Sequence, residues 1–218
     1  MTREENIAFM KDFFEKYYEQ LRNEDEVLVA GVKIPEEMVD HDLQADWKVW
    51  KLIPSTVTEA DLSALEERLH IKLPECLRAF LSVYHHRFDG PVGRNEINAP
   101  FESFERTYTH NLAENGYLPF GWDSEGYYIR CIDLTNMPDE EHCPVVQVDH
   151  EPFFDLQYEY SERGKTVPKE ELEPLIEEVS ENFYEYLNAI LSGELDDYDE
   201  DEDFDDEDFD DDDDFDEF

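Results

Sequence analysis

Three side chains in two predicted strands have the types needed for nucleophilic chemistry. Cys131 could act as the nucleophile, His150 as the base, and Asp133 could orient the base. The sequence contains no Gly-x-Ser-x-Gly elbow or other nucleophile motif beside them. A small buried thiol is the simpler interpretation of Cys131, because apolar residues surround it in the segment YIRCIDL. We therefore predict no catalytic residues and no enzymatic activity.

Histidine and cysteine side chains also raise the question of a metal site. His142 and Cys143 are adjacent, His150 follows, and His85 and His86 form a separate pair. Structural zinc sites usually have pairs of ligands two to four residues apart. The sequence has no C-x-x-C or H-x-x-x-H pattern. We therefore expect neither metal ligands nor a cofactor.

The segment WDSEG, residues 122–126, combines an aromatic residue with carboxylates at a predicted turn. Exposed aromatics in partly desolvated pockets are typical anchors of protein interfaces. A turn with a tryptophan packed in the core is an equal alternative. Predicted strands end at Asp133 and at His150–Glu151, and we expect these ends to line the same rim as the turn. The candidate partner-binding residues are Trp122, Asp123, Glu125, Gly126, Asp133, His150 and Glu151.

The elements that must position these residues follow from hydrophobic periodicity and turn signals. Residues 3–22 predict an amphipathic helix, 27–34 a short strand, and 35–46 a short helical stretch. Trp47 and Trp50 are three residues apart, so we expect them on one helical face, in core packing, with contact to a partner as the alternative. Thr58 and Asp61 predict a capped helix that ends near His70. The remaining expected elements are a helix from Pro74, strands at 117–122, 126–134, 144–150 and 152–160, and a last helix after Pro168 that ends at Gly193.

This order of elements predicts an α+β fold, with helices packed on one antiparallel-rich sheet. A C-terminal helix completes the fold, and an acidic tail follows it. The expected division is an N-terminal helical extension at 1–46, a folded domain at 47–193, and a disordered tail at 194–218.

The charge of the chain is its dominant compositional feature. The 218 residues include 17 Lys and Arg against 60 Asp and Glu, which gives a formal net charge of −43. Such a chain repels the phosphates of nucleic acids and anionic lipid surfaces, and it attracts basic proteins. We therefore expect a basic protein partner, no direct nucleic-acid binding and no membrane association. Three cysteines without a close pair indicate reduced thiols in the cytoplasm.

The last 25 residues contain 19 of the acidic side chains. Such a segment cannot form a core, and its self-repulsion predicts disorder. Solubility is one role for it. Its four phenylalanines suggest a second role, because acidic runs with interspersed aromatics suit binding to a cationic surface, and the ending DDDDDFDEF resembles the acidic tip of bacterial single-stranded-DNA-binding proteins. The candidate tail-binding residues are Phe204, Phe209, Phe215 and Phe218.

Several segments together resemble one known family. TVTEADLSALEERLHIKLPECLRAFLSVYH, the upstream WKVWKLIPS, YLPFGWDSEGYYIRCIDL with PVVQVDHEP, and VSENFYEYLNAIL are similar to successive motifs of the SUKH superfamily, the Smi/Knr-type domain. The resemblance runs from Trp47 to Leu191. It implies a sheet backed by helices and no settled catalytic activity. Many bacterial members resemble immunity proteins that bind a toxin, commonly a nuclease, and fungal relatives are regulators of cell-wall synthesis and signalling.

The sequence thus predicts a non-enzymatic cytoplasmic binding protein of the immunity type, an antitoxin for a basic toxin such as a nuclease. The alternative is a regulatory scaffold or chaperone-like module that docks basic partners through its acidic tail. The oligomeric state is left open.

Overall fold

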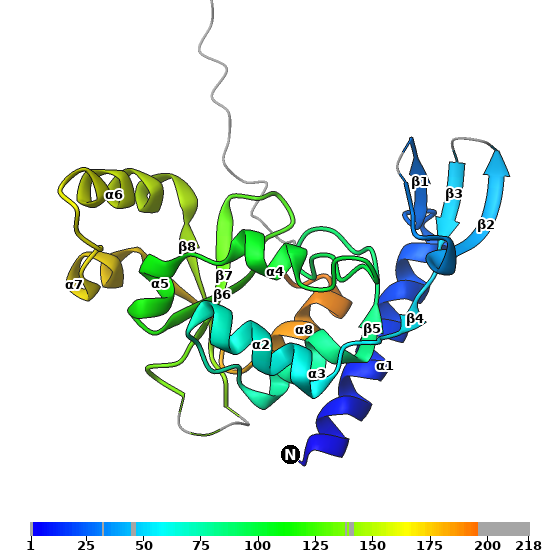
Figure 1. Ribbon diagram of the computed structural model, residues 1–218, viewed down its shortest axis with the longest axis horizontal. Helices are drawn as coiled ribbons and strands as arrows, with labels where there is room; N and C mark the ends of the chain where they lie inside the picture. The colour runs from blue at the N-terminus through cyan, green and yellow to red at the C-terminus, as the bar shows by residue number, and fades with distance from the viewer. Residues whose placement is uncertain (1, 32, 45–46, 138, 140–141, 196–218) are drawn as a thin grey trace, which may run out of the picture.

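The computed structural model describes residues 2–31, 33–44, 47–137, 139 and 142–195, and it shows an α+β fold (Figure 1). Apart from Glu194 and Leu195, the expected tail at 194–218, with its four phenylalanines, lies outside the described residues. A four-stranded antiparallel sheet organises the body of the protein, in the order β6-β7-β8-β9. Its strands are β6 (Tyr117–Trp122), β7 (Tyr128–Asp133), β8 (Val145–Asp149) and β9 (Ile176–Ser180).

Helices cover both faces of this sheet. Side chains of successive strand residues point to opposite faces, and apolar residues occur on both. In β7, Ile132 belongs to the larger core, whereas Ile129 and Cys131 belong to a smaller one. The helices of the larger core are α1 (Arg3–Asn23), α2 (Glu59–Leu69), α3 (Glu75–Val83), α4 (Glu102–Thr107) and α8 (Phe183–Ser192). The helices of the smaller core are α5 (His110–Glu114), α6 (His150–Glu162) and α7 (Lys169–Leu172).

The predicted helical hairpin is confirmed in α2 and α3. The Thr58 side chain accepts a hydrogen bond from the Asp61 N–H, and the Asp61 carboxylate accepts one from the Thr58 N–H at 2.8 Å. This reciprocal capping box satisfies amide groups that a helix start leaves without partners. The helix ends at His70 in the left-handed conformation, with φ of 56°. Buried Glu66 then accepts hydrogen bonds from the Leu73 N–H and the Arg78 guanidinium at 3.0 and 2.7 Å, which hold the two helices together.

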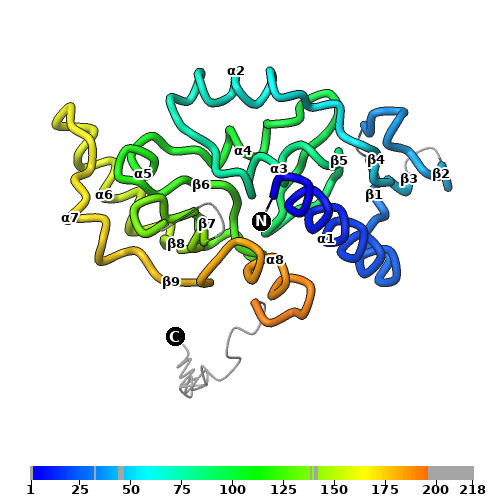
Figure 2. Tube along the Cα trace, turned by 90° about the horizontal axis from the view of Figure 1, so that it is seen from below, coloured from blue at the N-terminus to red at the C-terminus, as the bar shows by residue number. Residues whose placement is uncertain are grey.

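The predicted N-terminal helix is also confirmed, and it is part of the core. Met10, Phe13 and Phe14 of α1 are almost fully buried, and α1 packs against α3 and α8 (Figure 2). Its capping box at Thr2 again has an acidic residue, Glu5, at the third helical position. Tertiary packing of this apolar face stabilises α1 more than its intrinsic helix propensity does.

A second, three-stranded sheet projects from the C-terminal half of α1 (Figure 1). It consists of β1 (Leu28–Ala30), β3 (Trp47–Trp50) and β2 (Val39–Gln44), all antiparallel, and a 3₁₀ turn, η1 (Glu36–Met38), precedes β2. The strand predicted at 27–34 is confirmed over Leu28–Ala30. The helical prediction for 35–46 holds only for η1, which follows Pro35, and it is wrong from Val39 on, because pairing of β2 with β3 overrides the local preference. A short ladder of β4 (Ile53–Pro54) with β5 (Tyr84–His85) links this region to α3.

The two tryptophans illustrate the same error. Residues three apart share a helical face but point to opposite faces of a strand. Trp50 is 2% exposed and packs against Phe88 and Tyr18, whereas Trp47 is 46% exposed. Core packing is therefore confirmed for Trp50 and wrong for Trp47.

Two further predictions are wrong near the C-terminus. The segment 152–160, expected as a strand, lies in α6, whose first turn is capped by the Asp149 side chain. The single helix expected after Pro168 is divided into α7, a 3₁₀ turn η2 (Glu173–Leu175), strand β9 and helix α8. Pairing of Ile176 with Val148 adds β9 to the sheet edge and interrupts the helix. The predicted helix end is confirmed at Gly193, with φ of 76°.

Candidate functional site

The turn between β6 and β7 has a defined local structure. The Asp123 N–H donates to the Tyr128 carbonyl at 3.0 Å, and the Asp123 carboxylate accepts from the Tyr128 N–H at 2.8 Å. Gly126 has a φ of 83°, a left-handed conformation that glycine adopts without strain. Asp123 is 2% exposed and organises the turn, whereas Glu125 and Tyr127 are exposed. The turn therefore presents an aromatic ring and a carboxylate to solvent.

Aromatic side chains gather around His150, where β8 passes into α6. The centroids of the rings of Trp122, Tyr127 and Phe154 lie 5.9, 6.4 and 5.7 Å from that of the His150 ring. His150 Nδ1 donates to the Tyr127 carbonyl at 2.7 Å, and the His150 main-chain N–H donates to the same oxygen at 3.0 Å. Tyr158 lies one turn beyond Phe154 on α6. These five residues are called the His150 surface below: Trp122, Tyr127, His150, Phe154 and Tyr158.

Three rings of this cluster are exposed, whereas Trp122 is partly buried and packs against the smaller core. Tyr127 is 55% exposed, Phe154 44% and Tyr158 66%. They are three of the five large apolar side chains exposed in the described part of the chain; the other two, Leu43 and Trp47, lie on the projecting sheet. Isolated apolar residues are common on protein surfaces, but a contiguous group marks an interaction site.

Carboxylates border the His150 surface on one side. Glu125, Asp149 and Glu151 line a hollow of about 390 Å³ together with Tyr127 and Tyr128. The Asp149 carboxylate accepts from the Glu151 N–H at 2.9 Å, which positions both side chains at the start of α6. On the other side, Trp122 and Phe154 line a hollow of about 320 Å³. The surface is therefore aromatic at its centre and acidic along one border.

Asp133 lies away from the other predicted site residues. In the antiparallel sheet, Asp133 of β7 pairs with Tyr117, whereas Asp149 of β8 pairs with Tyr128 at the opposite end. Adjacent antiparallel strands end at opposite edges, so the ends of β7 and β8 do not share a rim. The Asp133 carboxylate accepts hydrogen bonds from the N–H and hydroxyl of Thr135 at 2.8 and 2.6 Å, and it also accepts from Asn136. These contacts organise the turn after β7.

Cys131 is not placed for nucleophilic chemistry. It is 0% exposed and faces the smaller core, and burial raises the pKa of its thiol far above the ordinary range. A reactive cysteine requires the opposite shift, toward the thiolate. Among the described residues, no three His, Cys, Asp or Glu side chains are grouped to hold a metal ion. His142 instead contacts the Asp139 carboxylate, at 2.8 Å from its Nδ1 atom.

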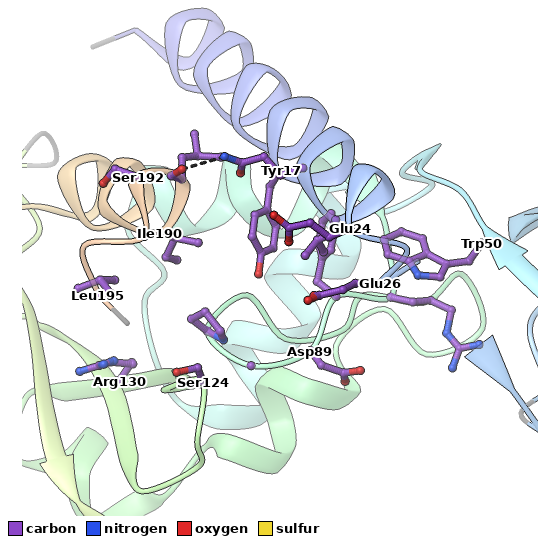
Figure 3. Close-up of a pocket in the computed structure, with 18 residues that line it drawn as sticks. Tyr17, Glu24, Glu26, Trp50, Asp89, Ser124, Arg130, Ile190, Ser192 and Leu195 are labelled. Atoms are coloured by element: carbon purple, nitrogen blue, oxygen red, sulfur yellow. Dashed lines mark hydrogen bonds between the residues drawn. The ribbon is translucent and has the colours of Figure 1, made fainter. Parts of the chain in front are cut away.

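A pocket of about 560 Å³ lies between α1, the loop 87–91 and the end of α8 (Figure 3). The carboxylates of Glu24 and Glu26 and the hydroxyl of Tyr17 point toward the same space. Ser124 lines the opposite wall, so the turn at 123–127 separates this pocket from the His150 surface. Arg87 and Arg130 also line this pocket, so its wall carries charges of both signs.

Sequence reasoning identified Trp122, Glu125, His150 and Glu151, which the structure brings together, but it missed three aromatic residues of the surface. The strand predicted at 152–160 concealed Phe154 and Tyr158, which are four residues apart and share one face of α6. A strand also places residues four apart on one face, but only a helix makes them close neighbours.

The fold and this surface define an α+β domain with an exposed aromatic surface of the kind that binds other proteins. The sequence model of the SMI1 / KNR4 family (SUKH-1) matches residues 56–189, and the chain belongs to this family. The resemblance found in the sequence is thereby confirmed, although the lead-in WKVWKLIPS lies outside the matched range. No curated protein matches the chain. Among the described residues, every helix is too short or too polar to cross a membrane.

Membership supports a binding role of the immunity-protein kind at the level of the family. The match includes all of β6, β7, β8 and α6, and therefore the whole His150 surface. It excludes α1 and the projecting sheet.

Proposed function

We propose that this chain is a non-enzymatic immunity protein that binds and neutralises a basic toxin, a nuclease, through the His150 surface. The packing of exposed Tyr127 and Phe154 around His150, with exposed Tyr158 one turn further along α6 and a border of carboxylates beside them, carries this proposal. Large aromatic side chains supply much of the affinity of protein interfaces.

The charges of the surface indicate the chemistry of the partner. Glu125, Asp149 and Glu151 lie along one border, in a chain with a formal net charge of −43. A nuclease has cationic side chains in the cleft where it binds phosphates, and carboxylates placed in that cleft would compete with nucleic acid. Long-range attraction would accelerate capture, and the aromatic side chains would slow release. We expect the association rate to fall strongly as salt rises from low to near-physiological concentration; a salt-insensitive rate would contradict this mechanism.

The test compares two matched double variants of the full-length chain. One carries Phe154→Ala and Tyr158→Ala, and the control carries Leu43→Ala and Trp47→Ala, which remove exposed apolar side chains from the projecting sheet. Host proteins retained by the wild-type chain are identified, and each is expressed alone and together with each form.

We expect one basic protein that is toxic when expressed alone. The wild-type chain and the control should suppress its toxicity and its nuclease activity, and the Phe154/Tyr158 variant should not. Equal suppression by all three forms would remove the His150 surface from the mechanism. Absence of any toxic partner would contradict the proposed function itself.

The alternative function, a regulatory scaffold that docks basic partners through its tail, rests on the acidic sequence after Gly193. A full-length variant with alanine at Phe204, Phe209, Phe215 and Phe218 distinguishes the two functions. Immunity through the His150 surface predicts that this variant still neutralises the toxin. The scaffold function predicts that it loses its partners, whereas the Phe154/Tyr158 variant retains them.

A further inference from the structure

Two cysteines far apart in the sequence have neighbouring sulfur atoms in the structure. The Sγ atoms of Cys76 and Cys143 are 3.4 Å apart, and both side chains are 0% exposed. Cys76 lies in the first turn of α3, and Cys143 lies two residues before β8. A disulfide bond is about 2.0 Å long, so the two sulfurs need to approach by about 1.4 Å to bond.

The third cysteine provides an internal contrast. Cys76 and Cys143 belong to the larger core, whereas Cys131 belongs to the smaller core on the other face of the sheet. Met137 adds a third sulfur to the pair, with its Sδ atom 3.4 Å from Cys143 Sγ. The larger core thus contains a compact group of sulfur atoms that the proposed binding function does not use.

We propose that Cys76 and Cys143 are a modification site, at which a peroxide forms an intramolecular disulfide bond and a dithiol reductant breaks it. One thiolate attacks the peroxide O–O bond and becomes a sulfenic acid, with release of water. The second thiol attacks that sulfur, the S–O bond breaks, and a second water leaves. In total, two thiols and one hydrogen peroxide give one disulfide and two waters. In the reverse direction, the dithiol is oxidised and the two thiols are restored.

The position of the bond determines what it would change. It would link α3 to the start of β8 and close a loop between residues 67 positions apart. Val145 at the start of β8 pairs with Ile132, and Asp149 at its other end pairs with Tyr128 beside the His150 surface. The bond is therefore at the end of the sheet away from that surface. It would constrain unfolding without altering the surface, and partner binding should be the same in both redox forms.

The test counts and maps thiols in the full-length protein. The reduced chain and a chain treated with hydrogen peroxide while folded are each then denatured, so that N-ethylmaleimide, which is much larger than hydrogen peroxide, reaches and alkylates every remaining thiol. The reduced chain should carry adducts on all three cysteines. The oxidised chain should carry one adduct, on Cys131, and a peptide cross-link between Cys76 and Cys143. Dithiothreitol should restore all three adducts.

Two variants complete the test. Cys131→Ser should form the same cross-link as the wild-type chain, and Cys143→Ser should form no intramolecular cross-link. Three adducts after peroxide treatment, a cross-link that includes Cys131, or sulfinic and sulfonic acids in place of a cross-link would each overturn the proposal. Because the wild-type chain alone gives these outcomes, the test does not depend on the folding of either variant.

Discussion

Two histidines of this protein are each surrounded by three aromatic rings, one in the interior and one at the surface. The His86 ring lies 4.8, 6.5 and 4.9 Å from the rings of Phe14, Phe80 and Phe88, and His86 is 1% exposed. The corresponding distances around His150 are 5.7 to 6.4 Å, and 25% of its side chain is exposed.

Burial gives the two clusters different roles. The His86 cluster joins α1 to α3 and the 86–88 segment, and its rings are covered on all sides. In the His150 cluster the rings of Tyr127 and Phe154 are about half exposed, so a partner protein can bury them on binding. The same residue types therefore stabilise the fold in one region and provide a binding surface in the other. This comparison predicts effects on folding for the first cluster and on binding for the second.

The largest expected effect is on folding, at the His86 cluster. Phe14→Ala removes a fully buried ring that contacts Phe80, His86 and Phe88, and should lower the free energy of unfolding by about 3–5 kcal/mol. Phe154→Ala is the matched control, and its effect on unfolding should stay within about 0.5 kcal/mol. Urea unfolding of the full-length variants measures both. If Phe14→Ala and Phe154→Ala lowered the free energy of unfolding equally, the two clusters would not differ in the way that the structure indicates.

The second prediction concerns pH. Burial, with a smaller contribution from the neighbouring His85, lowers the pKa of His86 from its ordinary value of 6.5 to about 3. Between these values the unfolded chain binds a proton that the folded chain excludes, so stability is complete above about 6.5 and falls as pH approaches 3. From pH 7.5 to 5, His86 should contribute a loss of about 2 kcal/mol. His86→Phe should show a correspondingly smaller loss in urea unfolding at the two pH values. If His86→Phe loses as much stability between pH 7.5 and 5 as the wild-type chain does, this role of His86 is contradicted.

The third prediction concerns partner binding at the His150 surface. Phe154→Ala should weaken binding of the basic protein captured by the wild-type chain by about tenfold, which corresponds to about 1.4 kcal/mol. Trp47→Ala, at a similarly exposed aromatic residue of the projecting sheet, should leave affinity unchanged. Calorimetry or surface plasmon resonance measures both affinities. A larger loss for Trp47→Ala would shift the binding surface to the other end of the molecule.

The smallest expected effect is on the rate of association. Removing two charges with Glu125→Gln and Glu151→Gln should slow capture of the same partner by about two- to threefold at low salt. The dissociation rate should change less, because charges at an interface border act mainly on encounter. Glu36→Gln and Glu37→Gln remove the same charge from exposed positions near the projecting sheet and serve as the control. Equal slowing by both variants would show that net charge, and not the border, steers association.

The sequence predicted much of the fold wherever the signal was local. The Thr58 capping box, the helix from Pro74 and the strands at β6, β7 and β8 are all confirmed. The errors at 35–46, 152–160 and 168–182 concern segments whose state depends on a distant partner strand or helix. Strand β9 forms because Ile176 pairs with Val148, and the residues of β9 alone do not predict that pairing.

The candidate site divides in the same way. The turn at 122–126 and its neighbours at His150 and Glu151 could be named from the sequence, because each lies at a predicted turn or at the predicted end of a strand. Asp133 could not be separated from them, because the direction of pairing between β7 and β8 decides which strand ends lie together.

The sequence by itself determined the acidic character, the family and the locally capped elements of this protein. Charge is a sum over residues, and capping and helical periodicity act within a few positions of the chain. Only the tertiary structure decided which aromatic clusters are buried, that Asp133 lies away from His150, and that the sulfurs of Cys76 and Cys143 meet. These properties depend on contacts between segments distant in sequence, which form only when helices and sheets pack together.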